Sequence, residues 1–234
     1  NLREMARFSE YAVERSHNID IVMRVRSLLG DYPFWRRIRG DGNCFYRSVA
    51  VGALEFGIRS PGAGLPFLTH LRDTIANASL ESSSLSCHQS PCVAFLDSVL
   101  ADYGTLPGRE EASFANATYA LSNEICYRLL HGSCDRNLVA TFRALASCFL
   151  RDDAADMSAW LSMPVEDYCL TVDSMGTDAE GLAILALSQA LSIRLRIVYL
   201  HRDRDLGHYS YPVDNEDPCH VHLLLSPGHY DLLY

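Results

Sequence analysis

The sequence predicts an α+β (mixed α/β) fold in which a helical body is followed by a small β-sheet. Through the middle of the chain, apolar residues recur at three- and four-residue spacing, as at Leu138, Phe142 and Leu145. From about residue 193 the pattern changes to the alternation of apolar and polar residues that is typical of strands. The 234 residues are 48% hydrophobic and show no internal repeat, which argues against a disordered, collagen-like or coiled-coil chain. A single domain over residues 1–234 is therefore expected.

The first third begins with a stretch, residues 1–17, that we interpret as a short extension before the first helix. A helix is predicted over about 18–29, because Asn18 can cap its start and Gly30 can end it. A short extended segment is predicted at 34–38.

A turn with two glycines, at 40–43, separates that segment from a second helix, predicted from Cys44 to about Phe56. The stretch 57–65, with its Gly, Ser and Pro residues, is predicted to be a loop. Amphipathic patterns then predict four further helices, near 66–79, 91–103, 111–131 and 135–151.

The last third contains the strands. A helix is predicted near 178–191, followed by a strand at 193–199, where apolar residues alternate with two arginines. The polar stretch 201–218 is predicted to be a loop. Two more strands, 219–225 and 229–234, are joined by a Ser-Pro-Gly turn.

The charge balance argues against nucleic acid as a partner. The chain has 20 basic residues against 29 acidic ones, a net charge of −9, whereas phosphate backbones are bound by clustered basic residues. No apolar run approaches the roughly 18 residues of a membrane-spanning helix, and no signal-peptide core is visible near Asn1. We therefore expect no membrane partner and a cytoplasmic location that can extend to the nucleus.

The eight cysteines are expected to be reduced, buried thiols, because a chain of this length needs no disulfides for stability. No CxxC pair occurs and no four-ligand zinc spacing is convincing, so no metal site is predicted. His220 and His222 share a strand face beside Cys219, which hints at a metal, but a fourth ligand is missing. A surface or hydrogen-bonded His pair is the simpler interpretation.

Cys44 is the first candidate for chemistry. It follows the glycine turn and stands at the N-terminal end of a predicted helix, where the helix dipole and free backbone N–H groups favour a thiolate. The glycines also allow backbone N–H groups to converge on an oxyanion. The alternative for Cys44 alone is a buried structural thiol beside a turn.

His229 and Asp231 are the second candidate. Residues two apart on a strand point to the same face, so the Asp can orient a neighbouring imidazole. Tyr230 and Leu232 take the opposite face, which fits a core. From this strand alone a solvated polar face is the simpler interpretation, but together with Cys44 the three side chains form a Cys-His-Asp arrangement of acyl-transfer enzymes.

Two motifs carry a family resemblance. The segment 41–47, Asp-Gly-Asn-Cys-Phe-Tyr-Arg, resembles the nucleophile motif of the OTU (ovarian tumour) cysteine proteases. The segment 227–234, Pro-Gly-His-Tyr-Asp-Leu-Leu-Tyr, is similar to the catalytic-His strand of the otubain branch of that family. Met175 and the segment 186–191 resemble the otubain helix before the central strand. The resemblance extends from about Tyr11 to the end of the sequence.

The resemblance implies a papain-like OTU fold and a deubiquitinase without a cofactor. Such an enzyme hydrolyses isopeptide bonds in polyubiquitin, here expected in chains linked through lysine 48 or lysine 63 of ubiquitin. Cys44 would be the nucleophile, His229 the base and then the acid, and Asp231 the residue that holds the imidazole. Backbone N–H groups of Asp41, Gly42 and Cys44 would form the oxyanion hole. Ubiquitin, polyubiquitin and ubiquitin-conjugating (E2) enzymes are the implied partners.

The chain departs from the family pattern where Gly40 replaces a frequent proline before the Asp-Gly-Asn-Cys motif. Two alternatives to an active isopeptidase are kept, and the departure at Gly40 bears on the first of them. One is an otubain-like protein that sequesters ubiquitin or an E2 enzyme with weak catalysis. The other is a cysteine protease for a different ubiquitin-like modifier.

Overall fold

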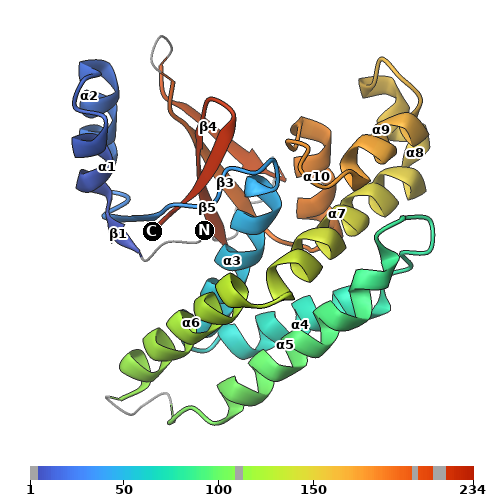
Figure 1. The fold of residues 1–234 in the computed structure, drawn as a ribbon, viewed down its shortest axis with the longest axis horizontal. Coiled ribbons are helices and arrows are strands. Elements are labelled where there is room, and N and C mark those ends of the chain that lie inside the picture. Colours follow the sequence, from blue (N-terminus) through green and yellow to red (C-terminus); the bar gives the residue numbers. More distant parts are fainter. Residues whose placement is uncertain (1–4, 109–112, 202–204, 213–219) are drawn as a thin grey trace.

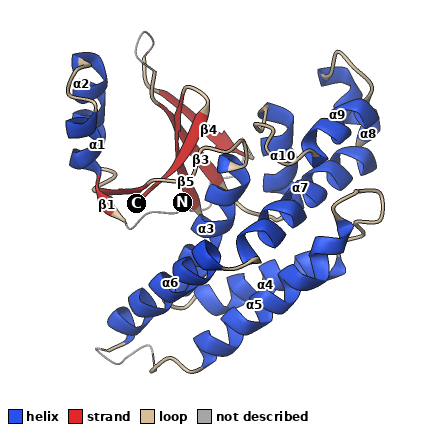
Figure 2. Cartoon of the chain, in the orientation of Figure 1, coloured by secondary structure: helices blue, strands red, loops and turns tan. Residues whose placement is uncertain are grey.

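The computed structural model describes residues 5–108, 113–201, 205–212 and 220–234. These residues form a six-stranded sheet with helices on both faces, so the expected mixture of helices and strands is confirmed (Figures 1 and 2). The strand order is β1-β2-β6-β5-β3-β4, in which β3 and β5 are parallel and all other neighbours are antiparallel. The strands are β1 (Ala6–Arg7), β2 (Phe34–Arg36), β3 (Leu195–Tyr199), β4 (Gly207–Tyr211), β5 (Val221–Ser226) and β6 (His229–Leu233).

Most of the helices lie on one side of the sheet and form the body of the molecule (Figure 1). The helices before and within this body are α1 (Phe8–Glu14), α2 (Ile19–Leu28), α3 (Cys44–Arg59), α4 (Gly64–Asn77), α5 (Gln89–Gly104), α6 (Phe114–His131), α7 (Cys134–Asp152), α8 (Ala154–Met157), α9 (Val165–Asp173) and α10 (Gly181–Ala190). Two short 3₁₀ helices, Ser86–His88 and Ser158–Trp160, complete the description.

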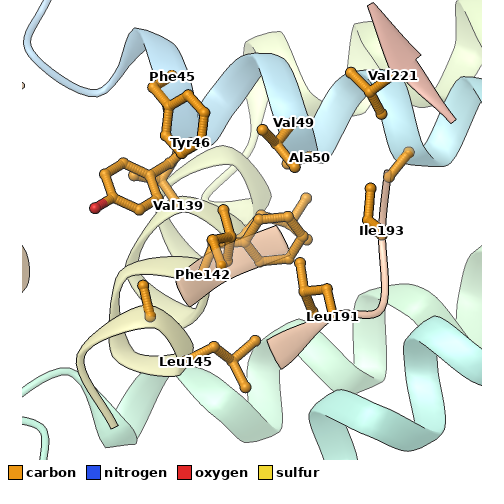
Figure 3. Close-up of a cluster of buried hydrophobic side chains, with 14 of the residues drawn as sticks. Phe45, Tyr46, Val49, Ala50, Val139, Phe142, Leu145, Leu191, Ile193 and Val221 are labelled. Carbon is orange, nitrogen blue, oxygen red and sulfur yellow. The ribbon is translucent and has the colours of Figure 1, made fainter. Parts of the chain in front are cut away.

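The main core lies between this body and the sheet. Helix α3 contributes Phe45 and Val49, helix α7 contributes Phe142, and the segment before β3 contributes Leu191, as Figure 3 shows. All four side chains are at most 1% exposed. Burial of such side chains stabilises the fold by about 1.5–3 kcal/mol each, and it fixes the start of α3 against α7.

A second core covers the other face of the sheet. Phe8 and Tyr11 from α1 and Val25 from α2 pack against Trp35 of β2 and Leu224 of β5. The ring of Tyr11 meets that of Trp35 edge-on, with centroids 4.8 Å apart. The short extension interpreted at residues 1–17 therefore contains a helix, α1, that precedes the first one predicted from the sequence. The seven-residue helix was missed because it is too short to show a periodic pattern.

Replacing Phe8 by alanine is expected to lower the free energy of unfolding by about 3–5 kcal/mol, because the substitution opens a cavity between α1 and the sheet. Val13 lies on the same helix and is 71% exposed, so Val13→Ala should cost less than about 0.5 kcal/mol. Guanidinium denaturation of both variants measures the difference. Equal midpoints would show that α1 does not stabilise the sheet.

Most predicted elements are confirmed within a few residues. The helix predicted at 18–29 is α2, and its cap is present, because the Ile21 N–H donates to Asn18 Oδ1 over 3.2 Å. The stretch 57–65 was wrongly predicted to be all loop: α3 continues to Arg59, because the apolar side chain at Ile58 is buried in the main core.

Strand β4 and helix α9 were also missed. Strand β4 lies within the predicted loop 201–218, and none of its side chains is fully buried, so its sequence lacks the apolar alternation of a core strand. It pairs with β3 along the edge of the sheet. Helix α9 begins after Pro164, which can precede a helix but not continue one. Within the predicted loop, residues 202–204 and 213–218 lie outside the described residues.

The described cysteines are all free thiols, five of them buried, one partly exposed (Cys134) and one exposed (Cys87). Cys219 lies outside the described residues. Among the described helices, none is long and apolar enough to cross a bilayer.

Candidate active site

Cys44 is the first residue of α3, as the sequence predicted, and its side chain belongs to the edge of the main core with 2% exposure. The turn before it depends on Gly42, whose φ of +71° favours glycine. A Cβ atom at Gly42 would lie 1.8 Å from the carbonyl oxygen of Gly176. This close approach fixes the turn against the segment that follows α9.

The structure brings His229 and Asp231 of β6 to the same place. His229 Nε2 lies 2.9 Å from Asp231 Oδ1, and Cys44 is close enough to the same ring to contribute to its raised pKa. Because Asp231 occupies Nε2, Nδ1 is the nitrogen left for the thiol. Asp231 Oδ1 accepts a second hydrogen bond, 2.8 Å, from the backbone N–H of Ile38. Since Asp231 is only 1% exposed, its carboxylate is a fixed support for the imidazole.

These contacts decide the charge of the imidazole. The hydrogen bond to Asp231, and after it the hydrogen bond to Cys44, raise the pKa of His229 from 6.5 to about 10, although burial acts in the opposite direction. At neutral pH the ring therefore carries a proton. An imidazolium beside a cysteine favours the thiolate, which is the nucleophilic form of the side chain.

Gly40 lies against the same ring. A Cβ atom at Gly40 would be 3.3 Å from His229 Nδ1, which is a tight contact. The glycine that replaces the family's frequent proline therefore leaves room at the nitrogen that faces Cys44.

The backbone of the turn offers donors to an oxyanion. Among the described residues, the N–H groups of Asp41, Gly42 and Cys44 have no hydrogen-bond acceptor in the protein. The intervening N–H, that of Asn43, is already used, because it donates to Asp41 Oδ1 over 3.1 Å. The three N–H groups that the sequence analysis named are thus the ones available to a substrate.

Two arginines bind the side chain of Asp41. Arg47 binds both carboxylate oxygens, at 2.7 and 3.0 Å, and Arg39 binds Oδ2 at 2.8 Å. Burial raises the pKa of Asp41, but the hydrogen bonds and charge of Arg47 outweigh burial and lower it to about 2. Arg47 also binds Asp135 at the start of α7. Asp41 is therefore an ionised support of the turn.

A third arginine was missed by the sequence analysis. Arg143 of α7 is fully buried, and its guanidinium donates to Gly42 O and Asn43 Oδ1 in the turn. A signal was present, since Arg143 stands four residues after Val139 and three before Ala146, at a position where the helix pattern predicts an apolar residue.

The other candidate histidines do not join this site. His220 Nδ1 accepts a hydrogen bond from the Arg194 backbone N–H, and His222 Nδ1 is hydrogen-bonded with the Tyr32 hydroxyl. No group of three potential metal ligands occurs in the part of the chain that the structure describes. Both imidazoles are therefore hydrogen-bonded within the fold, the simpler of the two interpretations.

Comparison with known proteins agrees with this arrangement. A family model described as Peptidase C65 Otubain matches residues 4–234. The chain belongs to the otubain family. The expected cysteine-type peptidase is thereby confirmed at the level of the family.

Two named otubain relatives show the extent of the similarity. The "Ubiquitin thioesterase otubain-like" of Caenorhabditis elegans is 28% identical over 210 residues, which cover 85% of this chain and 68% of that protein. "Ubiquitin thioesterase OTUB2" of Homo sapiens is 28% identical over 215 residues, 90% of this chain and 85% of that protein.

The fold is also that of solved otubain structures. The structure of h/ceOTUB1 with ubiquitin aldehyde and UBCH5B~Ub superimposes with a TM-score of 0.79 at 26% identity, and covers all of this chain and 89% of that chain. The corresponding complex with UBC13~Ub gives the same TM-score at 27% identity, covering all of this chain and 90% of that chain. The OTU fold expected from the two sequence motifs is thus confirmed.

Proposed function

We propose that this otubain is a ubiquitin isopeptidase that uses Cys44, His229 and Asp231 as its catalytic triad. The observation that carries the proposal is the meeting of these three side chains beside a turn with free N–H groups. The names of the relatives, which are ubiquitin thioesterases, support ubiquitin as the substrate, as do the neighbours that contain ubiquitin aldehyde.

In the proposed reaction, the Cys44 thiolate attacks the carbonyl carbon of the C-terminal glycine of ubiquitin. The oxyanion that forms accepts hydrogen bonds from the turn, including those from Gly42 and Cys44. As the C–N bond breaks, His229 gives its proton to the leaving lysine amine, and a thioester remains on Cys44. Water then attacks the thioester while His229 takes a proton, and breakage of the C–S bond releases the ubiquitin carboxylate.

We propose polyubiquitin as the substrate class, with chains linked through lysine 48 or lysine 63 of ubiquitin as the first candidates. E2 enzymes are a second proposed partner class, because the neighbouring h/ceOTUB1 structures contain UBCH5B~Ub and UBC13~Ub. A cytoplasmic location that extends to the nucleus accords with such partners.

Incubation with the full set of linkage-defined di-ubiquitins tests the proposal. We expect cleavage of at least one linkage to mono-ubiquitin, and the pattern gives the linkage preference. Isopeptide-linked dimers of other ubiquitin-like modifiers serve as the control, because an isopeptidase specific for ubiquitin should leave them intact.

Absence of cleavage by the wild-type protein for every ubiquitin linkage would overturn the proposal. Ubiquitin binding without turnover would favour a protein that sequesters ubiquitin. Cleavage of another modifier alone would favour a cysteine protease for that ubiquitin-like modifier. Titration against mono-ubiquitin separates these two results.

A further inference from the structure

We infer that Arg143 is a positioning residue for the oxyanion hole, whose guanidinium fixes the Gly42–Asn43 peptide and so aims the N–H groups on either side of it. The inference rests on the proposed function, since it assumes a reaction that passes through an oxyanion. Arg143 is placed outside the triad, on α7, and acts through the turn without touching the substrate.

The contacts of Arg143 converge on two loops. Nη2 donates to Gly42 O at 2.9 Å, to Asn43 Oδ1 at 2.8 Å and to Thr177 O at 2.6 Å. Nε donates to Asn43 Oδ1 at 3.1 Å, and Nη1 to Val172 O at 2.9 Å. All of these acceptors are uncharged oxygens. The Arg143 side chain thus binds the turn at residues 40–43, before Cys44, and also binds the two residues that flank the segment 173–176.

These contacts orient the N–H groups because a peptide unit is planar. The carbonyl of Gly42 points to Arg143, so the N–H of Asn43 points to the opposite side, where it meets Asp41 Oδ1. Both ends of this peptide are therefore held, one by Arg143 of α7 and the other by Asp41 of the turn, which Arg47 of α3 binds in turn. The N–H groups of the flanking residues have little freedom left.

The second loop reinforces the first. The N–H of Gly176 donates to Asn43 Oδ1 at 2.9 Å, the same oxygen that Arg143 binds. The carbonyl of Gly176 lies where a Cβ of Gly42 would be. Loss of the guanidinium would leave the Gly42 and Thr177 carbonyls without this donor and loosen both loops together.

The chemical character of Arg143 favours a positioning role over simple packing. It is 0% exposed, and burial lowers its pKa from the usual value. Its guanidinium carbon stacks 4.3 Å above the Tyr46 ring. A buried cation is costly, and an apolar side chain of similar size often stabilises a core equally well, whereas only an arginine can donate in one plane to several carbonyls.

The experiment compares Arg143→Gln and Arg143→Lys with Arg151→Gln, which removes an arginine of the same helix that binds Glu166 and Asp173 instead. Turnover of the ubiquitin aminocoumarin amide and of a Gly-Gly nitrophenyl ester is measured, together with alkylation of Cys44 by iodoacetamide. Alkylation needs the Cys44 thiolate but forms no oxyanion. It therefore separates an effect on the nucleophile from an effect on the oxyanion hole.

We expect Arg143→Gln to lower kcat by about 10²-fold on both substrates, the loss typical of an oxyanion-hole donor, with KM and the alkylation rate changed less than about threefold. Arg143→Lys should recover part of kcat. Arg151→Gln should leave kcat unchanged within about threefold, even where it lowers the thermal midpoint.

An unchanged kcat in Arg143→Gln, or an equal fall in kcat and in alkylation, would overturn the inference. If Arg143→Gln does not fold, Arg143→Lys and Asn43→Ala give the same comparison, because the latter removes the shared acceptor of Arg143 and Gly176. A wild-type protein that turns over the ester but no ubiquitin substrate would contradict the proposed function alone, and the ester would still test Arg143.

Discussion

Replacement of Cys44 by alanine is expected to lower the hydrolysis of di-ubiquitin by at least about 10⁴-fold, because among the described residues Cys44 is the thiol beside His229 that can form the acyl-enzyme. Among the described cysteines, Cys44 is the one that contributes to the raised pKa of His229. Burial raises the pKa of other thiols well above the usual value, to about 12 for Cys92 and Cys126. These thiols stay protonated at neutral pH and cannot substitute for it.

The fold should survive the Cys44→Ala change. The thiol lies at the first position of α3, and removal of one sulfur atom from this edge of the core should cost about 1 kcal/mol of unfolding free energy. Cys87→Ala is the matched control, because Cys87 is exposed and lies outside the site; it should keep full activity. Gel assays of di-ubiquitin cleavage with both variants measure the effect. Residual turnover above about 1% in Cys44→Ala would exclude Cys44 as the nucleophile.

The sequence predicted the parts of the site that depend on local patterns. A glycine turn before an apolar helix placed Cys44 at the start of α3, and the two-residue spacing on β6 placed His229 and Asp231 on one face. Their meeting was predicted from the three residue types and then from the family resemblance, and no local pattern encodes it, because the pairing of β2 with β6 joins segments almost 200 residues apart.

The supports of the site could not be predicted in the same way. Arg143 binds the turn from a position 101 residues along the chain from Gly42, and no local pattern encodes that contact. Asp231 Oδ1 accepts a hydrogen bond from the backbone N–H of Ile38. This contact depends on the register of β6 against β2 and the chain that follows it. The second core was missed for a related reason: the short helix α1 is stable only when packed on the sheet.

Replacement of His229 by alanine is expected to lower isopeptide hydrolysis by about 10³–10⁴-fold. The variant loses both the imidazolium that favours the Cys44 thiolate and the acid that protonates the leaving lysine. A ubiquitin thioester has a thiolate leaving group that needs no proton, so its hydrolysis should fall less than that of the isopeptide. Equal losses on the two substrates would show that His229 does not protonate the leaving group.

Asp231→Asn is the matched variant, because it keeps an oxygen for the Ile38 N–H but removes the charge beside the imidazole. It should slow the enzyme less than His229→Ala. Asp231 is the largest cause of the raised pKa of His229, about 10, so the variant should lower that pKa, and the ring should lose its proton at a lower pH. The alkaline limb of kcat/KM should therefore move down by about one pH unit or more. A pH profile from 6 to about 10.5 tests this, and an unmoved alkaline limb would contradict the assignment of Asp231 as the residue that holds the charged imidazole.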